Sequence, residues 1–178
     1  MRKHLLTAAL GGVLSLIMGA SGALADYTFT QQPNQLAIRL GALFPSTNTA
    51  QVFGGTTQFM GGLDYTLSAT RGKSPSSTGL FFDYSSSSHN SGYLHSGGLG
   101  LQYSTLWPMF IGGGVGVYNT AVRTPSGERS GNTTGAGGKV FLGYDLGSRA
   151  TVQLDYHIAP QTLGVNPNGL GLEFGFRL

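Results

Sequence analysis

Nine ionisable side chains share one property: each lies on the polar face of a segment in which apolar and polar residues alternate. They are Arg39, Asp64, Asp83, Lys139, Asp145, Asp155, His157, Glu173 and Arg177. Carboxylates beside a histidine could serve general acid–base catalysis, and carboxylates beside cations could form a network of salt bridges. Successive side chains of a β-strand point to opposite faces, so alternation with period two predicts strands. The chemistry open to these groups therefore depends on which side of a sheet they occupy.

Histidine and serine also raise the question of nucleophilic or metal-assisted catalysis. Beyond residue 25 the histidines are His89, His95 and His157, and His157 follows Asp155 on the same face. A Ser-His-acid set needs one serine aimed at the histidine, and the spacing alone identifies none. His89 and His95 have no carboxylate near them in the sequence, and the chain has no cysteine. We therefore expect neither a metal site nor a cofactor.

The alternating segments must position these groups, and they follow one another without an intervening helical pattern. The connections between them alternate in length, with polar stretches at 45–56, 86–92, 119–133 and 159–168. The other connections are shorter at 105–108 and 146–149, with a long exception at 69–77. Long loops on one side and short turns on the other are typical of an up-and-down outer-membrane barrel. The barrel could instead have ten strands, if residues 28–31 or part of 119–133 also pair as strands. The segments predict an eight-stranded antiparallel transmembrane β-barrel with strands at 36–44, 59–67, 79–85, 98–104, 109–118, 139–145, 150–158 and 170–178.

Residues 1–25 have the features of a secretory signal peptide. Arg2 and Lys3 begin it, residues 5–18 are apolar, and Ala23-Leu24-Ala25 is a small-x-small cleavage site. A transmembrane anchor would need about 20 apolar residues. We expect export and cleavage after Ala25, then a short periplasmic lead-in at 26–34 and the barrel at 35–178.

Composition favours lipid over water around the barrel. Charged residues make up only 10% of the 178 residues, and 30 residues are glycine. A water-facing surface usually carries about 25–35% charged residues. A narrow lumen, in contrast, is filled by small groups and paired charges. A nucleic-acid-binding protein would cluster its Lys and Arg, which are scattered singly here. The alternative is a soluble lipocalin-like carrier, which has its apolar face inside.

Aromatic residues lie near the ends of the predicted strands, on the apolar face. Rings with a polar tip favour the headgroup region of a membrane, so the pattern predicts two aromatic girdles. The outer girdle comprises Phe44, Phe59, Tyr84, Tyr93 and Tyr156, and the periplasmic girdle comprises Tyr65, Tyr103, Trp107, Tyr144 and Phe176.

The last strand carries a family resemblance. Outer-membrane barrel proteins typically end in an amphipathic strand with an aromatic last residue, which the barrel-assembly machinery reads. This chain resembles that signal at Leu170, Leu172, Phe174, Phe176 and Leu178, although Leu178 stands where the family usually has Phe. Residues 144–156 also resemble the hairpin before the last strand in eight-stranded barrels of the OmpA, OmpX and opacity-protein type.

The resemblance implies a fold more specifically than a function. We expect a non-catalytic outer-membrane protein with a structural or adhesion-type role, no cofactor and no nucleic-acid partner, whose nine inward charges form a lumenal salt-bridge network. Its expected partners are outer-membrane lipid, the assembly machinery and an extracellular partner at the loops 85–91 and 124–134. The alternative is an enzyme that modifies lipid A or another envelope lipid. Deacylases of that type carry a His-x-Ser motif on an outward face, and no predicted strand of this chain carries that motif on its outward face.

Overall fold

The computed structural model describes residues 34–70, 75–89, 92–105, 108–124, 126, 130–147 and 149–178. The predicted signal peptide at 1–25, nearly all of the predicted lead-in at 26–34, and Trp107 lie outside these residues. In the described part of the chain, no helix has the length and apolar character needed to cross a membrane.

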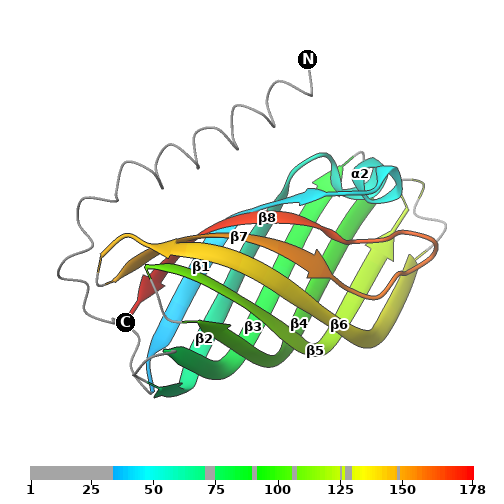
Figure 1. Ribbon diagram of the computed structural model, residues 1–178. Coiled ribbons are helices and arrows are strands. Elements are labelled where there is room, and N and C mark those ends of the chain that lie inside the picture. The colour runs from blue at the N-terminus through cyan, green and yellow to red at the C-terminus, as the bar shows by residue number, and fades with distance from the viewer. Residues whose placement is uncertain are drawn as a thin grey trace.

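Eight antiparallel strands form a closed barrel in chain order, as Figure 1 shows. The barrel closes where β1 pairs with β8, from Ala37 opposite Arg177 to Pro45 opposite Gly169. The prediction of an eight-stranded antiparallel barrel is confirmed. The strands are β1 (Leu36–Pro45), β2 (Gln58–Thr70), β3 (Ser76–His89), β4 (Gly92–Thr105), β5 (Met109–Arg123), β6 (Ser130–Asp145), β7 (Ala150–Ile158) and β8 (Gly169–Arg177).

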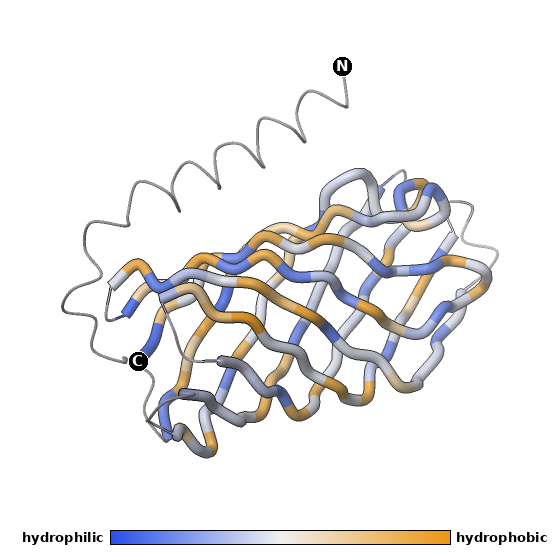
Figure 2. Tube along the Cα trace, viewed as in Figure 1, coloured by the Kyte–Doolittle hydropathy of each residue, from blue (hydrophilic) through white to orange (hydrophobic). Residues whose placement is uncertain are grey.

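The apolar residues of the strands face outward and the polar residues face the lumen. Val115 is 73% exposed and Leu99 is 65% exposed, whereas Arg39 and Asp83 are each 2% exposed. Along the tube of Figure 2 apolar and polar residues alternate within strands. A lipocalin-like carrier needs the apolar face inside, so this arrangement contradicts the lipocalin-like alternative.

Four strands run further than predicted at the end of the barrel opposite the C-terminus. β3 reaches His89 and β4 begins at Gly92, while β5 reaches Arg123 and β6 begins at Ser130. The loops predicted at 86–92 and 119–133 are therefore wrong over most of their length. Their Ser, Thr, Asn and Gly residues pair with one another as ladders, as in Asn119 opposite Thr134. These residues extend existing strands, so the described residues form eight strands; residues 28–31 lie outside the described part of the chain.

The direction of the apolar side chains reverses in these extensions. Leu99 and Val117 point outward, but Leu94 and Val122, further along the same strands, point inward and are fully buried. A short helix, α2 (Asn48–Gly54), lies over this mouth of the barrel within the predicted loop 45–56 (Figure 1). Its Ala50 packs with Leu94, Val122 and Val165 in a small apolar cap.

Local sequence explains why α2 forms. The Thr47 side chain accepts a hydrogen bond from the backbone N–H of Ala50 at 3.3 Å, which satisfies one of the free donors at a helix start. Gly55 ends the helix with φ at 72°, a conformation that favours glycine.

Candidate functional site

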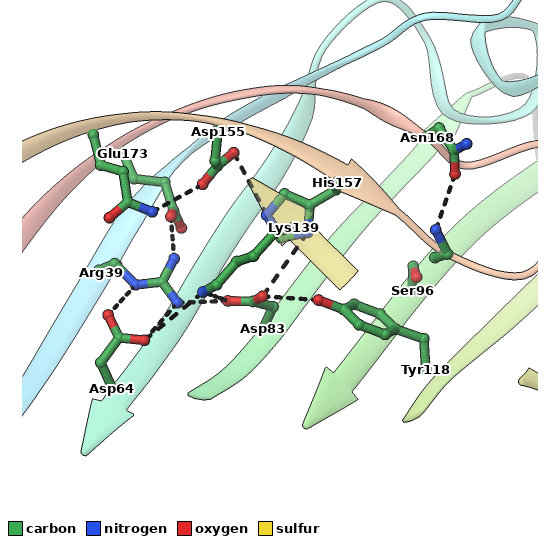
Figure 3. A network of polar contacts seen from close by, with 12 residues as sticks. Arg39, Asp64, Asp83, Ser96, Tyr118, Lys139, Asp155, His157, Asn168 and Glu173 are labelled. Carbon is green, nitrogen blue, oxygen red and sulfur yellow. Dashed lines mark hydrogen bonds and ion pairs between the residues drawn. The ribbon is translucent and has the colours of Figure 1, made fainter. Parts of the chain in front are cut away.

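A group of polar side chains occupies the middle of the lumen, and we call it the lumenal cluster. It is positioned by the alternation of seven strands, each of which turns one or two of these residues inward. Figure 3 shows the members pointing toward one another. They are Arg39 (β1), Asp64 (β2), Asp83 (β3), Tyr118 (β5), Lys139 (β6), Asp155 and His157 (β7), and Glu173 (β8).

Arg39 is the hub of the lumenal cluster. Its Nε and Nη2 atoms donate to the two carboxylate oxygens of Asp64 at 2.7 and 3.0 Å. Nη2 also donates to Asp83 Oδ1 at 2.5 Å, and Nη1 donates to Glu173 Oε2. One guanidinium thus links four strands, and its planar fork suits this multiple recognition of carboxylates.

Lys139 and Tyr118 complete the surroundings of Asp83. Lys139 Nζ lies 3.1 Å from Asp83 Oδ1 and 3.8 Å from Asp64 Oδ1. It also lies 4.4 Å from the centre of the Phe81 ring, a cation–π distance. The Tyr118 hydroxyl donates to Asp83 Oδ2 at 3.0 Å.

The close packing around Tyr118 depends on a missing side chain. A Cβ atom at Gly98 would lie 2.5 Å from Cγ of the Tyr118 ring, so a larger residue there would displace the ring.

The β7 side of the cluster is less completely paired. His157 Nε2 lies 3.5 Å from Asp155 Oδ1, and His157 Nδ1 lies 3.9 Å from Asp83 Oδ2. Gln153 donates to Asp155 Oδ2 at 3.3 Å. Three buried atoms of the cluster have no hydrogen-bond partner: Asp155 Oδ1, His157 Nε2 and Glu173 Oε1.

The nine predicted residues divide into two groups. Seven of them belong to the lumenal cluster. Arg177 and Asp145 instead form a separate buried ion pair, which lies at the end of the barrel where both β6 and β8 end. Tyr118 was not among the predicted site residues, although it lies on the inward face of its strand, because a phenol carries no charge in a sequence pattern.

The lumen contains little free space. A cavity of about 50 Å³ lies on the C-terminal side of the cluster and is lined by Arg39, Asp64, Gln102 and Arg177 among others. A cavity of about 10 Å³ lies on the other side, between Met60, Asp83, Tyr118 and His157. These volumes hold one or a few water molecules. The cluster therefore fills the barrel and lies between the two cavities.

One serine–histidine contact lies on the outward face, where a sequence motif could not reveal it. The Ser86 hydroxyl lies 2.8 Å from His95 Nδ1, and the Tyr84 hydroxyl lies 2.9 Å from the same nitrogen. Ser86 and His95 are register partners on β3 and β4. A catalytic triad also needs an acid that orients the histidine. In the part of the chain that the structure describes, no ion pair joins His95 to a carboxylate, and no group of three His, Cys, Asp or Glu residues could hold a metal.

The predicted aromatic girdles are distributed as follows. Tyr103, Tyr144 and Phe176 lie near the strand ends on the C-terminal side, and Phe44, Phe59 and Tyr156 lie near the opposite ends. Tyr65 lies five residues before the end of β2, opposite Leu36 at the start of β1. Tyr84 lies five residues inside β3, opposite Gly61. Tyr93 belongs to the extension of β4, opposite Arg123. The C-terminal residues Phe174, Phe176 and Leu178 are exposed on the outside of the barrel.

Comparison with known proteins identifies the fold. No family model matches the chain, and no curated protein matches it in sequence. The N-terminal β-barrel domain of Pseudomonas aeruginosa OprF has a TM-score of 0.55 at 16% identity, covering 83% of this chain and all of that domain.

Ail, the attachment invasion locus protein of Yersinia pestis, is also similar. Its crystal structure with the heparin analogue sucrose octasulfate has a TM-score of 0.58 at 10% identity, covering 83% of this chain and 100% of that one. Its structure in a phospholipid bilayer nanodisc has a TM-score of 0.51 at 11% identity, covering 82% of this chain and 99% of that one. The chain therefore has the fold of the small eight-stranded outer-membrane barrels.

Proposed function

We propose that this protein is a non-catalytic β-barrel of a bacterial outer membrane that binds an extracellular polypeptide along the free edge of β6. The observation that carries the binding role is that β6 continues for eight residues beyond its last pairing with β7. Export through residues 1–25 and recognition of the last strand by the assembly machinery are parts of the same proposal.

The outward face supports the membrane location. The exposed apolar side chains of the strands form a continuous belt, which water would penalise at about 25 cal/mol per Å². β7 and β8 have nine residues each, close to the 9–11 that a tilted strand needs to span a bilayer. The apolar side chain points outward at Leu99 and inward at Leu94. Because an outward apolar side chain is favourable in lipid and unfavourable in water, this change supports a membrane boundary between the two residues.

Beyond this belt four strands continue as a projecting sheet, which we define as residues 87–89 of β3, 92–95 of β4, 119–123 of β5 and 130–137 of β6. Its outward face is polar: Asn119 donates to Asn132 Oδ1 at 2.5 Å and to Thr134 Oγ1 at 2.8 Å. Such side chains suit water, so the proposal places the projecting sheet outside the membrane.

The two sides of the projecting sheet differ. On the β3 side, α2 covers the end of the strand, and the Ser87 hydroxyl donates to the Gly54 carbonyl. On the β6 side, pairing with β7 ends at Gly138 opposite Ile158. Residues 130–137 form what we call the free edge. Among the described residues, no backbone hydrogen bond joins the free edge to the β7–β8 connection.

The β7–β8 connection packs on the inner face of the projecting sheet and leaves the free edge open. Thr162 Oγ1 donates to the Thr120 carbonyl at 3.0 Å, and Pro160 lies against Gly135. The free edge has the sequence SGNTTGAG, without a charge or a proline of the kind that blocks strand addition. Its unpaired backbone groups suit an extended polypeptide segment, which would add as a further strand.

The test uses the full barrel in nanodiscs and an octapeptide of alternating Thr and Val with blocked ends. We expect amide chemical-shift changes and exchange protection confined to the free edge. The double variant Asn132→Lys with Thr134→Lys should lose this binding, since lysine guards natural sheet edges. Ser88→Lys, on the outward face of β3 in the same sheet, is the matched control and should retain it. Equal loss in both variants, or binding elsewhere on the barrel, would contradict the proposal.

A further inference from the structure

The lumenal cluster contains more carboxyl groups than cations. Counting its described members, Asp64, Asp83, Asp155 and Glu173 face only the cations of Arg39 and Lys139, together with His157. If every carboxyl group were ionised, the cluster would carry a net charge of −2 with neutral His157 and −1 with the imidazolium. Burying uncompensated charge costs several kcal/mol per ion, so the cluster as built needs protons.

The contacts show where the compensation is missing. Arg39 and Lys139 together surround Asp64 and Asp83, and Arg39 reaches one oxygen of Glu173. Asp155 contacts neither cation within salt-bridge distance. Its Oδ1 atom and Glu173 Oε1 are both buried and have no partner. Asp155 and Glu173 are both buried on the inward face of the adjacent strands β7 and β8, where Asp155 lies opposite Gly171 and Glu173 lies opposite Gln153. Two neighbouring buried carboxyl groups repel each other when both are ionised, and one proton on the pair removes that repulsion.

We propose that at neutral pH the Asp155–Glu173 pair holds one proton. His157 lies between Asp83 and Asp155, with Nδ1 at 3.9 Å from Asp83 Oδ2 and Nε2 at 3.5 Å from Asp155 Oδ1. The three remaining carboxylates then face the cations of Arg39 and Lys139, together with His157. The charges and titratable groups around the pair are all included in this balance: Arg39 on β1, Asp64 on β2, Asp83 on β3, Tyr118 on β5, Lys139 on β6 and His157 on β7.

A proton suits this position better than a metal ion. Neither lumenal cavity is lined by Asp155 or Glu173. The Asp155 carboxyl group packs against the backbone of Gly171, where an added Cβ would lie 2.9 Å from Met60 Sδ. A calcium ion would need six to eight oxygen ligands around it. The packing leaves no room for that shell, so the pair is a proton site within a closed lumen.

Infrared spectroscopy of the barrel in nanodiscs at pH 7 tests this proposal. The wild-type protein should show the carbonyl stretch of a protonated carboxylic acid, and the band should shift on ¹³C labelling of Asp or Glu carboxyl groups. Glu173→Gln and Asp155→Asn should each lose the band. Asp145→Asn, a matched change in the separate Arg177–Asp145 ion pair, should retain it. A folded wild-type protein without the band, or a band that survives both Glu173→Gln and Asp155→Asn, would overturn the proposal.

Two further outcomes also test the proposal. If the variants do not fold, the isotope shift in the wild-type protein still tests whether a carboxyl proton is present. Loss of the band on adding calcium chloride would show a cation site in place of a proton site and would also overturn the proposal.

Discussion

Arg39 on β1 and Glu173 on β8 form a buried ion pair across the line where the barrel closes. Glu173 lies opposite Gly41 in the backbone register, and Arg39 lies opposite Gly175, so the two side chains meet diagonally over the β1–β8 ladder. The first and last strands are thereby joined by a charged contact as well as by backbone hydrogen bonds. Because Arg39 also binds Asp64 and Asp83, the contact that closes the barrel is continuous with the lumenal cluster.

Removing the hub should destabilise the barrel strongly. Arg39→Met leaves three carboxyl groups without their shared cation, and breaking a buried pair in this way costs about 3–5 kcal/mol. Urea unfolding from detergent micelles, followed by heat-modifiable gel mobility, measures the change. Arg149→Met, at an exposed turn, serves as the control and should have little effect. A cost below about 1 kcal/mol for Arg39→Met would show that the cluster is not a buried network.

A charge in the apolar belt should be far more costly than the same charge in the projecting sheet. Val115→Arg places a cation on the outward face of β5, where lipid contact would cost about 2–4 kcal/mol. Asn132→Arg places it on the outward face of the projecting sheet and should change stability by less than about 0.5 kcal/mol. Unfolding from phospholipid vesicles compares the two variants. Equal costs would contradict the placement of the lipid boundary.

The barrel should conduct few or no ions. Its lumen is filled by the lumenal cluster, with small cavities on either side, and eight strands leave an interior only wide enough for side chains. Planar-bilayer recordings of the purified protein should show no stable channel. Reproducible, protein-dependent conductance steps would mean that the cluster opens as a gate.

The Ser86–His95 contact should have no role in lipid chemistry. No carboxylate forms an ion pair with His95 within the described residues, and Tyr84 shares the same ring nitrogen. Lipid extracts from cells expressing the protein should match those from cells expressing Ser86→Ala when acyl composition is compared by mass. An acyl change that depends on both Ser86 and His95 would establish the lipid-modifying enzyme instead.

The sequence predicts the barrel well where one face meets lipid. From Leu36 to Phe44 and from Leu170 to Leu178, apolar residues recur at every second position, and both segments are strands with that face outward. From this alternation it follows directly that the side chains of Arg39 and Glu173 point inward. Their contact does not, because it depends on the register with which β1 and β8 close, and that register joins residues 134 positions apart.

The sequence predicts the projecting sheet poorly, for a physical reason. Residues 119–123 and 130–137 are polar or small on the outward face, so they lack the alternation that indicates a half-buried strand. The few apolar residues there, such as Val122, point inward under α2. Ser86 and His95 meet only through hairpin pairing, which no motif with fixed spacing describes.

The central claim is that the outward face of the strands lies in lipid while the projecting sheet lies in water. The chain has no cysteine, so single cysteines at Val115, Leu99 and Asn132 can carry a fluorophore without interference. In vesicles whose acyl chains are brominated, the fluorescence at positions 115 and 99 should be strongly quenched and that at position 132 should be almost unchanged. Equal quenching at all three positions, or none at 115 and 99, would contradict the account.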